Sequence, residues 1–578
     1  MFTLMFTLKK FASRSVLLGL GLLSLPGMQA LAQTTLISNI QGYSLAQPVP
    51  GSASPAASEE RTLQRFTALQ FTGNRIDRVY SAEEALPDTS GMTVIDGQGK
   101  TLLPGLIDAH GHVLSYGLSL LRVDLTGTAS EQEAVQRIVE FQQRNGSLDW
   151  IQGRGWNQVL WDSNAFPTAQ SLDSLFGDTP VWLSRVDGHA GWANTAAMQI
   201  AGVDILTQDP NGGQIIRDAE GRPTGVFVDN AMDLITANIP ELSIEDQKLA
   251  LRKALNALAA YGMTSVHDAG ISARTLEAYK ELLAEGPLPV RVNAMLGAGD
   301  PELETLLAAG HFTSPDETLT VNSIKISADG ALGSRGAALI EDYSDMPGHR
   351  GLLLLSPEQL GGYMETAMRA GFQVNVHAIG DDANRLVLDN FARLIPQTDT
   401  RALRHRIEHA QVLQYQDILR FAELGVIPSM QSTHATSDKN MAQDRLGEIR
   451  IQGAYAWRKL LDAGAVIANG SDFPVESPNP FFGLHAAITR QDHQNEPAGG
   501  WFPEERMTPE EAFASFTLDA AYAGHQEELL GTLEPGKAAD FILLEQDIFA
   551  AAASEIWKAQ VLETWVNGKR VMEATPPQ

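Results

Sequence analysis

The chain contains no cysteine, and this absence removes several kinds of site at once. Without thiols there can be no disulfide framework, iron–sulfur cluster, thiolate zinc ligand or cysteine nucleophile. A lipid anchor on a cysteine at a processed N-terminus is excluded for the same reason. Any metal site must therefore be built from histidine, aspartate, glutamate or a modified lysine.

Positive charge is also scarce. The 578 residues include 42 Lys and Arg against 70 Asp and Glu, which gives a formal net charge of −28. Nucleic-acid binding needs clustered basic side chains that displace counterions from phosphates, so no nucleic-acid partner is expected. The hydrophobic content of 44% is ordinary for a folded protein, and the length predicts one large domain with at least one smaller unit.

The N-terminus has the layout of a secretory signal peptide. Three basic residues within the first 14 positions precede an apolar stretch over residues 15–26, and Ala30-Leu31-Ala32 supplies a small-residue cleavage site. The apolar stretch is shorter than the roughly 20 residues that a membrane-spanning helix needs, which argues against a retained anchor. We therefore expect residues 1–32 to be removed, leaving no stable membrane anchor and a periplasmic or secreted protein.

Both ends of the remaining chain have strand-like patterns. Residues 66–71 and 75–80 flank a short Gly-Asn turn and predict a hairpin, and a similar pair of runs near the C-terminus flanks Asn567-Gly568. We expect residues 33–102 and 530–578 to build one small β-sandwich domain together. Between the signal segment and these strands, the residues 41–60 are rich in Pro, Ser, Ala and Gly and predict an exposed loop.

Residues 103–529 contain eight short β-rich segments, most of them followed by helix-like sequence. This alternation predicts an α/β fold, specifically a (β/α)8 TIM-like barrel. A long gap separates the first two segments, and we expect its residues 130–239 to form an inserted lid over the barrel mouth. The eight segments are 106–110, 264–268, 290–295, 323–327, 373–377, 406–409, 426–430 and 466–469.

The sharpest chemical signal is the pair His110 and His112 at the end of the first segment. In a strand, residues two apart project to the same side, so the two imidazoles could converge on one metal ion. The alternative is two unrelated surface histidines, because the pattern is short. However, three later segments also end in a metal-capable residue, at the position where barrel enzymes hold their active sites, namely His377, His409 and Asp472.

In their order and spacing, these motifs resemble the amidohydrolase superfamily, in particular its YtcJ-like branch, which includes N-substituted formamide deformylases. The resemblance covers nearly all of the chain after the signal segment. It implies a metal-dependent hydrolase that cleaves a C–N bond, of amide type, in a small molecule. The motifs are Leu103-Pro-Gly-Leu-Ile-Asp-Ala-His-Gly-His112, Lys325-Ile-Ser-Ala-Asp-Gly-Ala-Leu-Gly-Ser-Arg335, His377-Ala-Ile-Gly-Asp381, Glu408-His409-Ala410, Gly470-Ser-Asp472 and Gly536-Lys-Ala-Ala-Asp540.

The resemblance also implies roles for individual residues. Asp472 would serve both as a ligand and as a proton acceptor, and Lys325 would be carboxylated and bridge two zinc ions. The alternative for Lys325 is contact with substrate or a pair with Asp329, and the site would then hold one ion. The four histidines implied as ligands are His110, His112, His377 and His409.

The expected reaction follows from zinc chemistry. Zinc lowers the pKa of bound water toward about 7 and polarises a substrate carbonyl. Asp472 would take the proton of that water as general base and return it to the leaving amine as general acid. The same site could attack an ester, lactone or phosphoester, and a non-catalytic metal-dependent binding protein is a further alternative, although a pure binder needs no proton shuttle.

Weaker candidates surround this centre. His189, in Asp187-Gly-His189-Ala-Gly-Trp192, could donate a hydrogen bond to the substrate carbonyl, or it could be a structural histidine of the lid. Glu408 is expected on the opposite face of its strand from His409, in a supporting or packing role. The remaining candidates for substrate contact could instead pair with a carboxylate, reach only solvent, or pack in the core of the insertion; they are Asp329, Arg335, His434 and Trp192. Homo-oligomerisation is possible.

Overall fold

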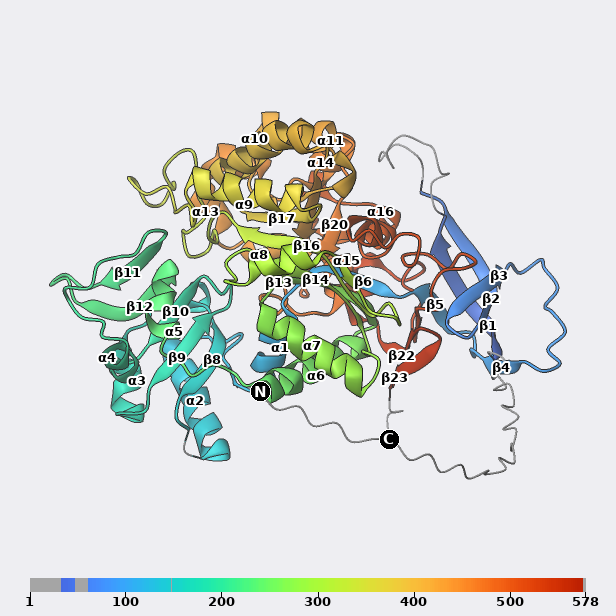
Figure 1. Cartoon of the computed structure of the whole chain (residues 1–578), viewed down its shortest axis with the longest axis horizontal. Helices are drawn as coiled ribbons and strands as arrows, with labels where there is room; N and C mark the ends of the chain where they lie inside the picture. The colour runs from blue at the N-terminus through green and yellow to red at the C-terminus, as the bar shows by residue number, and fades with distance from the viewer. Residues whose placement is uncertain (1–32, 47–60, 147, 575–578) are drawn as a thin grey trace, which may run out of the picture.

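The computed structural model describes residues 33–46, 61–146 and 148–574. The signal segment expected at residues 1–32 lies outside the described residues. A central barrel is flanked on one side by the insertion and on the other by a sheet from both chain ends (Figure 1). No helix in the described part of the chain has the length and apolarity needed to cross a membrane.

Eight parallel strands form the barrel, and they coincide with the eight predicted segments. The barrel closes between its last and first strands, where Phe473 forms a parallel bridge with Gly111 and the Asp472 N–H donates to the carbonyl of His110 at 2.7 Å. The predicted (β/α)8 barrel is therefore confirmed. Its strands are β6 (Leu106–Gly111), β13 (Met263–Ile271), β14 (Arg291–Gly297), β16 (Leu319–Ser327), β17 (Gln373–Ala378), β18 (Arg406–His409), β19 (Ile427–Gln431) and β20 (Ala468–Gly470).

Amphipathic helices cover the barrel. In α6 (Ile244–Ala260), Leu251, Leu255 and Leu258 recur at helical spacing and are buried in the main core. Helix α9 (Pro357–Arg369) begins with a capping box. The side chain of Ser356 accepts the N–H of Gln359, and the side chain of Gln359 accepts the N–H of Ser356. Further helices on the outside are α7 (Ala273–Glu285), α10 (Asp381–Thr398), α11 (Tyr415–Leu424) and α15 (Pro480–Thr489).

The insertion after the first barrel strand is a unit with its own sheet and core. Its six strands lie in the order β11-β12-β10-β9-β8-β7, with helices α2 (Glu131–Asn145), α3 (Ala169–Phe176) and α4 (Thr195–Ile200) beside them. Trp156 is fully buried and packs on the rings of Trp161 and Trp192 at 6.2 and 6.4 Å. The strands are β7 (Val123–Asp124), β8 (Ile151–Trp156), β9 (Val181–Arg185), β10 (Ala190–Ala193), β11 (Gly213–Arg217) and β12 (Pro223–Asp229).

The two chain ends share one sheet, in the order β23-β22-β21-β5-β1-β2-β3 with β4 beside β1. The sheet folds back on itself, since Phe71 on β2 packs on Phe541 of β21 and Trp565 of β22, which are not its neighbours in the sheet, at ring distances of 5.7 and 5.9 Å. Its strands are β1 (Thr34–Leu45), β2 (Leu63–Thr72), β3 (Arg75–Tyr80), β4 (Thr93–Asp96), β5 (Thr101–Pro104), β21 (Phe541–Leu544), β22 (Val561–Val566) and β23 (Lys569–Glu573).

The prediction of a loop over residues 41–60 is wrong for its first residues. Strand β1 continues to Leu45, and Gln41 and Gly42 pair with β5. The side chains of Tyr43 and Leu45 are buried, so pairing and burial outweigh the local turn-forming composition. Residues 47–60 of that loop lie outside the described residues.

A buried ion pair joins the barrel to the terminal sheet. The Arg291 side chain is fully buried, and its Nε and one terminal nitrogen donate to the two oxygens of Asp540 at 2.6 and 3.1 Å. Asp540 also accepts the N–H of Asn567 at 2.8 Å. The motif that ends in Asp540 is thus a structural joint between two parts of the fold.

We expect Asp540→Asn to lower the free energy of unfolding by about 3 kcal/mol, because it leaves a buried guanidinium without its counter-charge. Chemical denaturation followed by circular dichroism measures this loss. The matched control is Glu545→Gln, which breaks the exposed pair between Lys100 and Glu545 and is expected to cost less than about 1 kcal/mol. Equal losses for the two variants would contradict the special role of the buried pair.

Candidate metal centre

The end of strand β6 brings His110 and His112 to the barrel mouth. Their rings lie 5.4 Å apart, and His110 is completely buried whereas the side chain of His112 is about one third exposed. Asp108, on the same strand, accepts the N–H of His110 at 3.0 Å and the hydroxyl of Ser471 at 2.7 Å. This carboxylate therefore fixes the first barrel strand against the segment that carries Asp472.

Three histidines have their Nδ1 atoms placed against strong acceptors. Nδ1 of His112 donates to the carbonyl of Ala269 at 2.9 Å, and Nδ1 of His409 donates to Oε1 of Gln431 at 2.7 Å. Nδ1 of His110 donates to the carboxylate of Glu408. With the proton held on Nδ1, each Nε2 keeps its lone pair, which is the form that binds a metal.

The electrostatics of the mouth favour neutral imidazoles and an ionised carboxylate. Burial and the nearby charge of Lys325 lower the pKa of His110 to about 4, and burial holds the pKa of His409 well below its usual value. Burial alone would raise the pKa of Asp472, but the close approach of His112 and the neighbouring imidazoles of His409 and His110 hold it well below the usual range. Metal ligands need these protonation states.

Asp472 lies at the end of β20 with a left-handed backbone (φ 58°) that turns its carboxylate toward the histidines. Its Oδ1 is 3.0 Å from Nε2 of His112 and 3.5 Å from Nε2 of His110, and its Oδ2 is 3.8 Å from Nε2 of His434. Oδ1 is buried and has no hydrogen-bond partner among the described residues. Lone pairs that face one another across 3.0 Å repel unless a cation lies among them, so the donor set fits a metal ion.

Two overlapping trios of potential ligand atoms share Asp472. One trio is His110, His112 and Asp472, and the other is His409, His434 and Asp472, with the ligand atoms of each trio within 4.8 Å of one another. His377 lies beside the second trio, with its ring 4.5 Å from that of His409. The five residues implied as ligands, apart from Lys325, therefore gather at one place, and His434 joins them.

Lys325 reaches the same place from β16. Its Nζ lies 3.4 Å from Nε2 of His110, and burial lowers its pKa, which favours the neutral amine that carboxylation requires. The alternative pair with Asp329 does not form among the described residues. The buried carboxylate of Asp329 instead accepts backbone N–H groups at 2.8–2.9 Å from Ala338, Ile379 and Gly380.

The insertion delivers His189 to the mouth. Its ring lies 5.2 Å from that of His377, and its Nδ1 is 2.7 Å from Oδ1 of Asp229. Burial would lower the pKa of His189, but the hydrogen bond and charge of Asp229 outweigh it and raise the pKa to about 9. His189 is therefore protonated at neutral pH, unlike His110 and His409, and its ring can only donate hydrogen bonds.

Two candidates for substrate contact have other partners. Arg335 pairs with Asp345 at 2.9 Å, which is the alternative that the sequence left open. Trp192 is fully buried in the core of the insertion, and its Nε1 donates to the carbonyl of Thr168 at 2.9 Å. The indole N–H of Trp192 and two of the three side-chain nitrogens of Arg335 are therefore engaged inside the protein.

Sequence reasoning missed a buried polar network under the site. Arg406 donates to both oxygens of Glu408 at 2.7 and 2.8 Å and to Nδ1 of His267 at 2.9 Å. Glu408 thus supports His110 from inside the barrel. The signal that could have found Arg406 is a second charge two residues before Glu408 on a buried strand, since a buried charge needs a partner.

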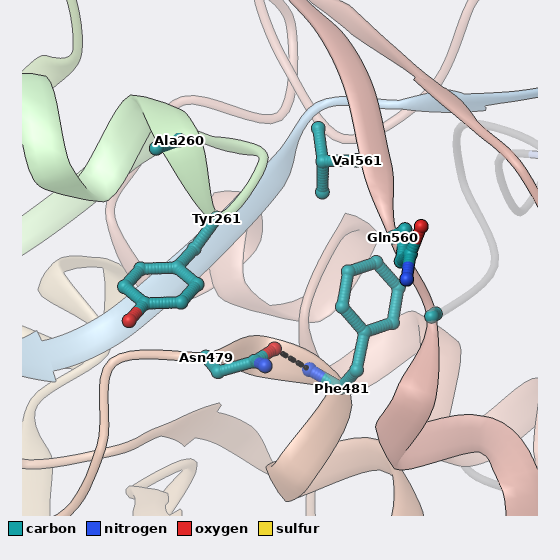
Figure 2. A pocket seen from close by; sticks show the side chains of 7 residues that line it. Ala260, Tyr261, Asn479, Phe481, Gln560 and Val561 are labelled. Carbon is teal, nitrogen blue, oxygen red and sulfur yellow. Dashed lines mark hydrogen bonds between the residues drawn. The ribbon is translucent and has the colours of Figure 1, made fainter. Parts of the chain in front are cut away.

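A separate pocket of about 320 Å³ lies on another part of the surface (Figure 2). Tyr261, Phe481 and Val561 line it, and Asn479 accepts the N–H of Phe481 at 3.1 Å, which caps helix α15. None of the predicted site residues lines this pocket, so it does not compete with the barrel mouth as the candidate site.

Comparisons with known proteins agree with this geometry. Residues 93–572 match the model of the amidohydrolase family. The protein LONG AFTER FAR-RED 3 of Arabidopsis thaliana is 35% identical and the match covers 83% of this chain and 84% of that protein. The putative amidohydrolase YtcJ of Bacillus subtilis is 33% identical, with 84% and 91% covered. The N-substituted formamide deformylase of Arthrobacter pascens is 28% identical, with 88% and 95% covered.

Among solved structures, an uncharacterized metal-dependent hydrolase from Pyrococcus horikoshii OT3 is similar throughout. It has a TM-score of 0.71 and 26% sequence identity, and the match covers 90% of this chain and 99% of that chain. The likeness therefore extends beyond the barrel, because the barrel strands and their helices make up only part of the matched length.

Proposed function

The chain belongs to the amidohydrolase family, and from this premise we propose that it hydrolyses the C–N bond of a small amide-type molecule at a zinc centre. The observation that carries the proposal is the convergence of the Nε2 atoms of His110 and His112 on the carboxylate of Asp472. A relative that is named an N-substituted formamide deformylase supports an amide-type substrate. Zinc is proposed because imidazoles and a carboxylate are its usual nitrogen and oxygen ligands.

The bound metal supplies the Lewis acidity that polarises the substrate carbonyl and activates water. Asp472 accepts the proton of the attacking water and later returns it to the nitrogen of the leaving amine, because its carboxylate is ionised and lies at the centre of the site. His189 donates a hydrogen bond from Nε2 to the carbonyl oxygen as negative charge develops there. Lys325, once carboxylated, adds an anionic oxygen ligand beside His110.

A substrate panel tests this proposal. The panel contains N-substituted formamides, longer N-acyl amines, esters, lactones and phosphoesters, and each compound is assayed with the zinc-loaded wild type and with Asp472→Asn. We expect the amide-type compounds to give the highest kcat/KM and to lose most of it in the variant. Preference for an ester, lactone or phosphoester would replace the C–N assignment. Metal binding without turnover of any compound would favour a binding protein.

We also propose that the protein is exported to the periplasm or secreted, on the basis of the basic, apolar and small-residue succession in residues 1–32. The expected mature N-terminus is Gln33. Expression of the full chain, recovery of the exported fraction and intact-mass measurement test this. A recovered protein that retains Met1 or Met5 would contradict cleavage after Ala32.

A further inference from the structure

His189 and Asp229 are bonded to each other twice, although 40 residues separate them along the chain. Nδ1 of His189 lies 2.7 Å from Oδ1 of Asp229, and the N–H of Asp229 donates to the carbonyl of His189 at 3.0 Å. The backbone bond belongs to the edge where β12 runs antiparallel to β10. Asp187 adds a third restraint by accepting the N–H of His189 at 3.1 Å.

The Asp229 side chain is completely buried, whereas the His189 side chain is 22% exposed. The second oxygen of Asp229, Oδ2, is buried and makes no hydrogen bond within the part of the chain that the structure describes. Burying a carboxylate costs free energy unless it is fully bonded. Packing alone therefore does not explain the buried carboxylate of Asp229, whose partner His189 faces the barrel mouth.

The glycine-rich segment after β16 makes room for this carboxylate. A Cβ atom on Gly330 would lie 2.7 Å from the oxygens of Asp229, and one on Gly336 would lie 2.5 Å from Oδ2. Only glycine allows the barrel loop to approach so closely. The motif Lys325 to Arg335 therefore does two things, since it places Lys325 in the metal centre and receives the carboxylate that holds His189.

We propose that Asp229 is a positioning residue, which holds His189 through Nδ1 so that Nε2–H of the imidazole faces the substrate carbonyl. The inference rests on the proposed hydrolysis of a carbonyl compound, but it holds for an amide and an ester alike. Asp229 acts through His189 and does not touch the substrate. The insertion thereby contributes the pair His189 and Asp229 to the candidate metal centre, whose other named residues come from the barrel domain.

A double-mutant cycle with Asp229→Asn and His189→Gln tests the proposal, using the panel compound that the wild type turns over fastest. We expect Asp229→Asn to lower kcat by about 10- to 100-fold, the usual effect of losing a partner that orients a catalytic group, with KM changed less than about threefold. In the His189→Gln background, Asp229→Asn is expected to add almost no further loss, because residues that act as a unit are not additive. Full additivity would overturn the proposal.

Crystal structures of the wild type, Asp229→Asn and Asp229→Ala supply a readout that needs no substrate. We expect the His189 ring to keep its orientation in the wild type and to leave the mouth in Asp229→Ala. An unchanged ring in Asp229→Ala would overturn the positioning role even if no panel compound were hydrolysed. Failure of the panel with the expected ring movement would contradict only the proposed function.

Gly330→Ala and two control variants separate positioning from folding. Gly330→Ala pushes on the carboxylate without removing it and is expected to lower kcat as Asp229→Asn does, whereas Gly362→Ala, whose Cβ meets nothing within 4 Å, is the control. Asp218→Asn is the matched carboxylate control, because Asp218 lies in the same insertion and pairs only with exposed groups. Loss of metal or of thermal stability that accounts for the whole effect of Asp229→Asn would contradict the proposal.

Discussion

Removing the metal with a chelator is expected to reduce hydrolysis to background, and Zn²⁺ is expected to restore it. The reason is that the mouth offers lone pairs on Nε2 of His110 and His112 together with the ionised Asp472 as ligands for a metal that activates water. Uncatalysed water has a pKa near 15.7, and a bound metal lowers it toward about 7, so the expected loss is several orders of magnitude.

Metal content by mass spectrometry and activity are measured on the same samples before chelation, after it and after readdition of zinc. The metal-free protein is also expected to unfold at a lower temperature, because ligands that bind only the native state stabilise it. Full activity in protein that is shown to be metal-free would refute the metal centre. Restoration by Mn²⁺ or Co²⁺ but not by Zn²⁺ would change the identity of the metal and leave the site intact.

Replacing Asp472 by asparagine is expected to lower turnover on the order of 10²–10⁴-fold, the usual effect of losing a positioned acid–base group. Most of the metal is expected to remain, because the histidines around Asp472 keep their Nε2 lone pairs. Asparagine is the suitable replacement, since it preserves the shape of the side chain and tolerates the left-handed backbone at this position (φ 58°).

Steady-state kinetics and metal analysis of the same preparation check this expectation. Asp462→Asn is the control, because Asp462 is an exposed carboxylate paired with Arg458 on helix α14 (Trp457–Asp462). Metal loss in proportion to the loss of activity would make Asp472 chiefly a ligand. Near-normal turnover with the metal bound would remove the proton-shuttle role of Asp472 and assign the proton transfer to another group.

Several features of the candidate site follow from residues that are close in sequence. His110 and His112 lie two positions apart at the end of one strand, and His377, His409 and Asp472 each follow an apolar run. Because the carboxyl ends of barrel strands meet at one face, recognising the strands was enough to bring these residues together.

Other contacts depend on residues that are far apart in sequence. Glu408 meets His110 across 298 positions, a contact set by the register and closure of the barrel. The strand over Gln41 to Leu45 forms against its own composition, because β5 pairs with Gln41 and Gly42 and β2 pairs with the residues from Gly42 to Leu45. Similarly, Arg335 donates to Asp345. The local sequence pattern had left open whether Arg335 pairs with a carboxylate or contacts substrate.

The sequence by itself therefore indicated the family through the order of its motifs. It also predicted the barrel and the metal-capable side chains at its mouth, because these depend on periodicity and on strand ends. Only the tertiary structure decided how those side chains are held. The proton on each Nδ1, the partner of Glu408, and the approach of Gly330 to Asp229 depend on distances between separate strands and on the docking of the insertion. The physical reason is that hydrogen bonds need atoms placed within a few tenths of an ångström, and only packing and register set positions that closely.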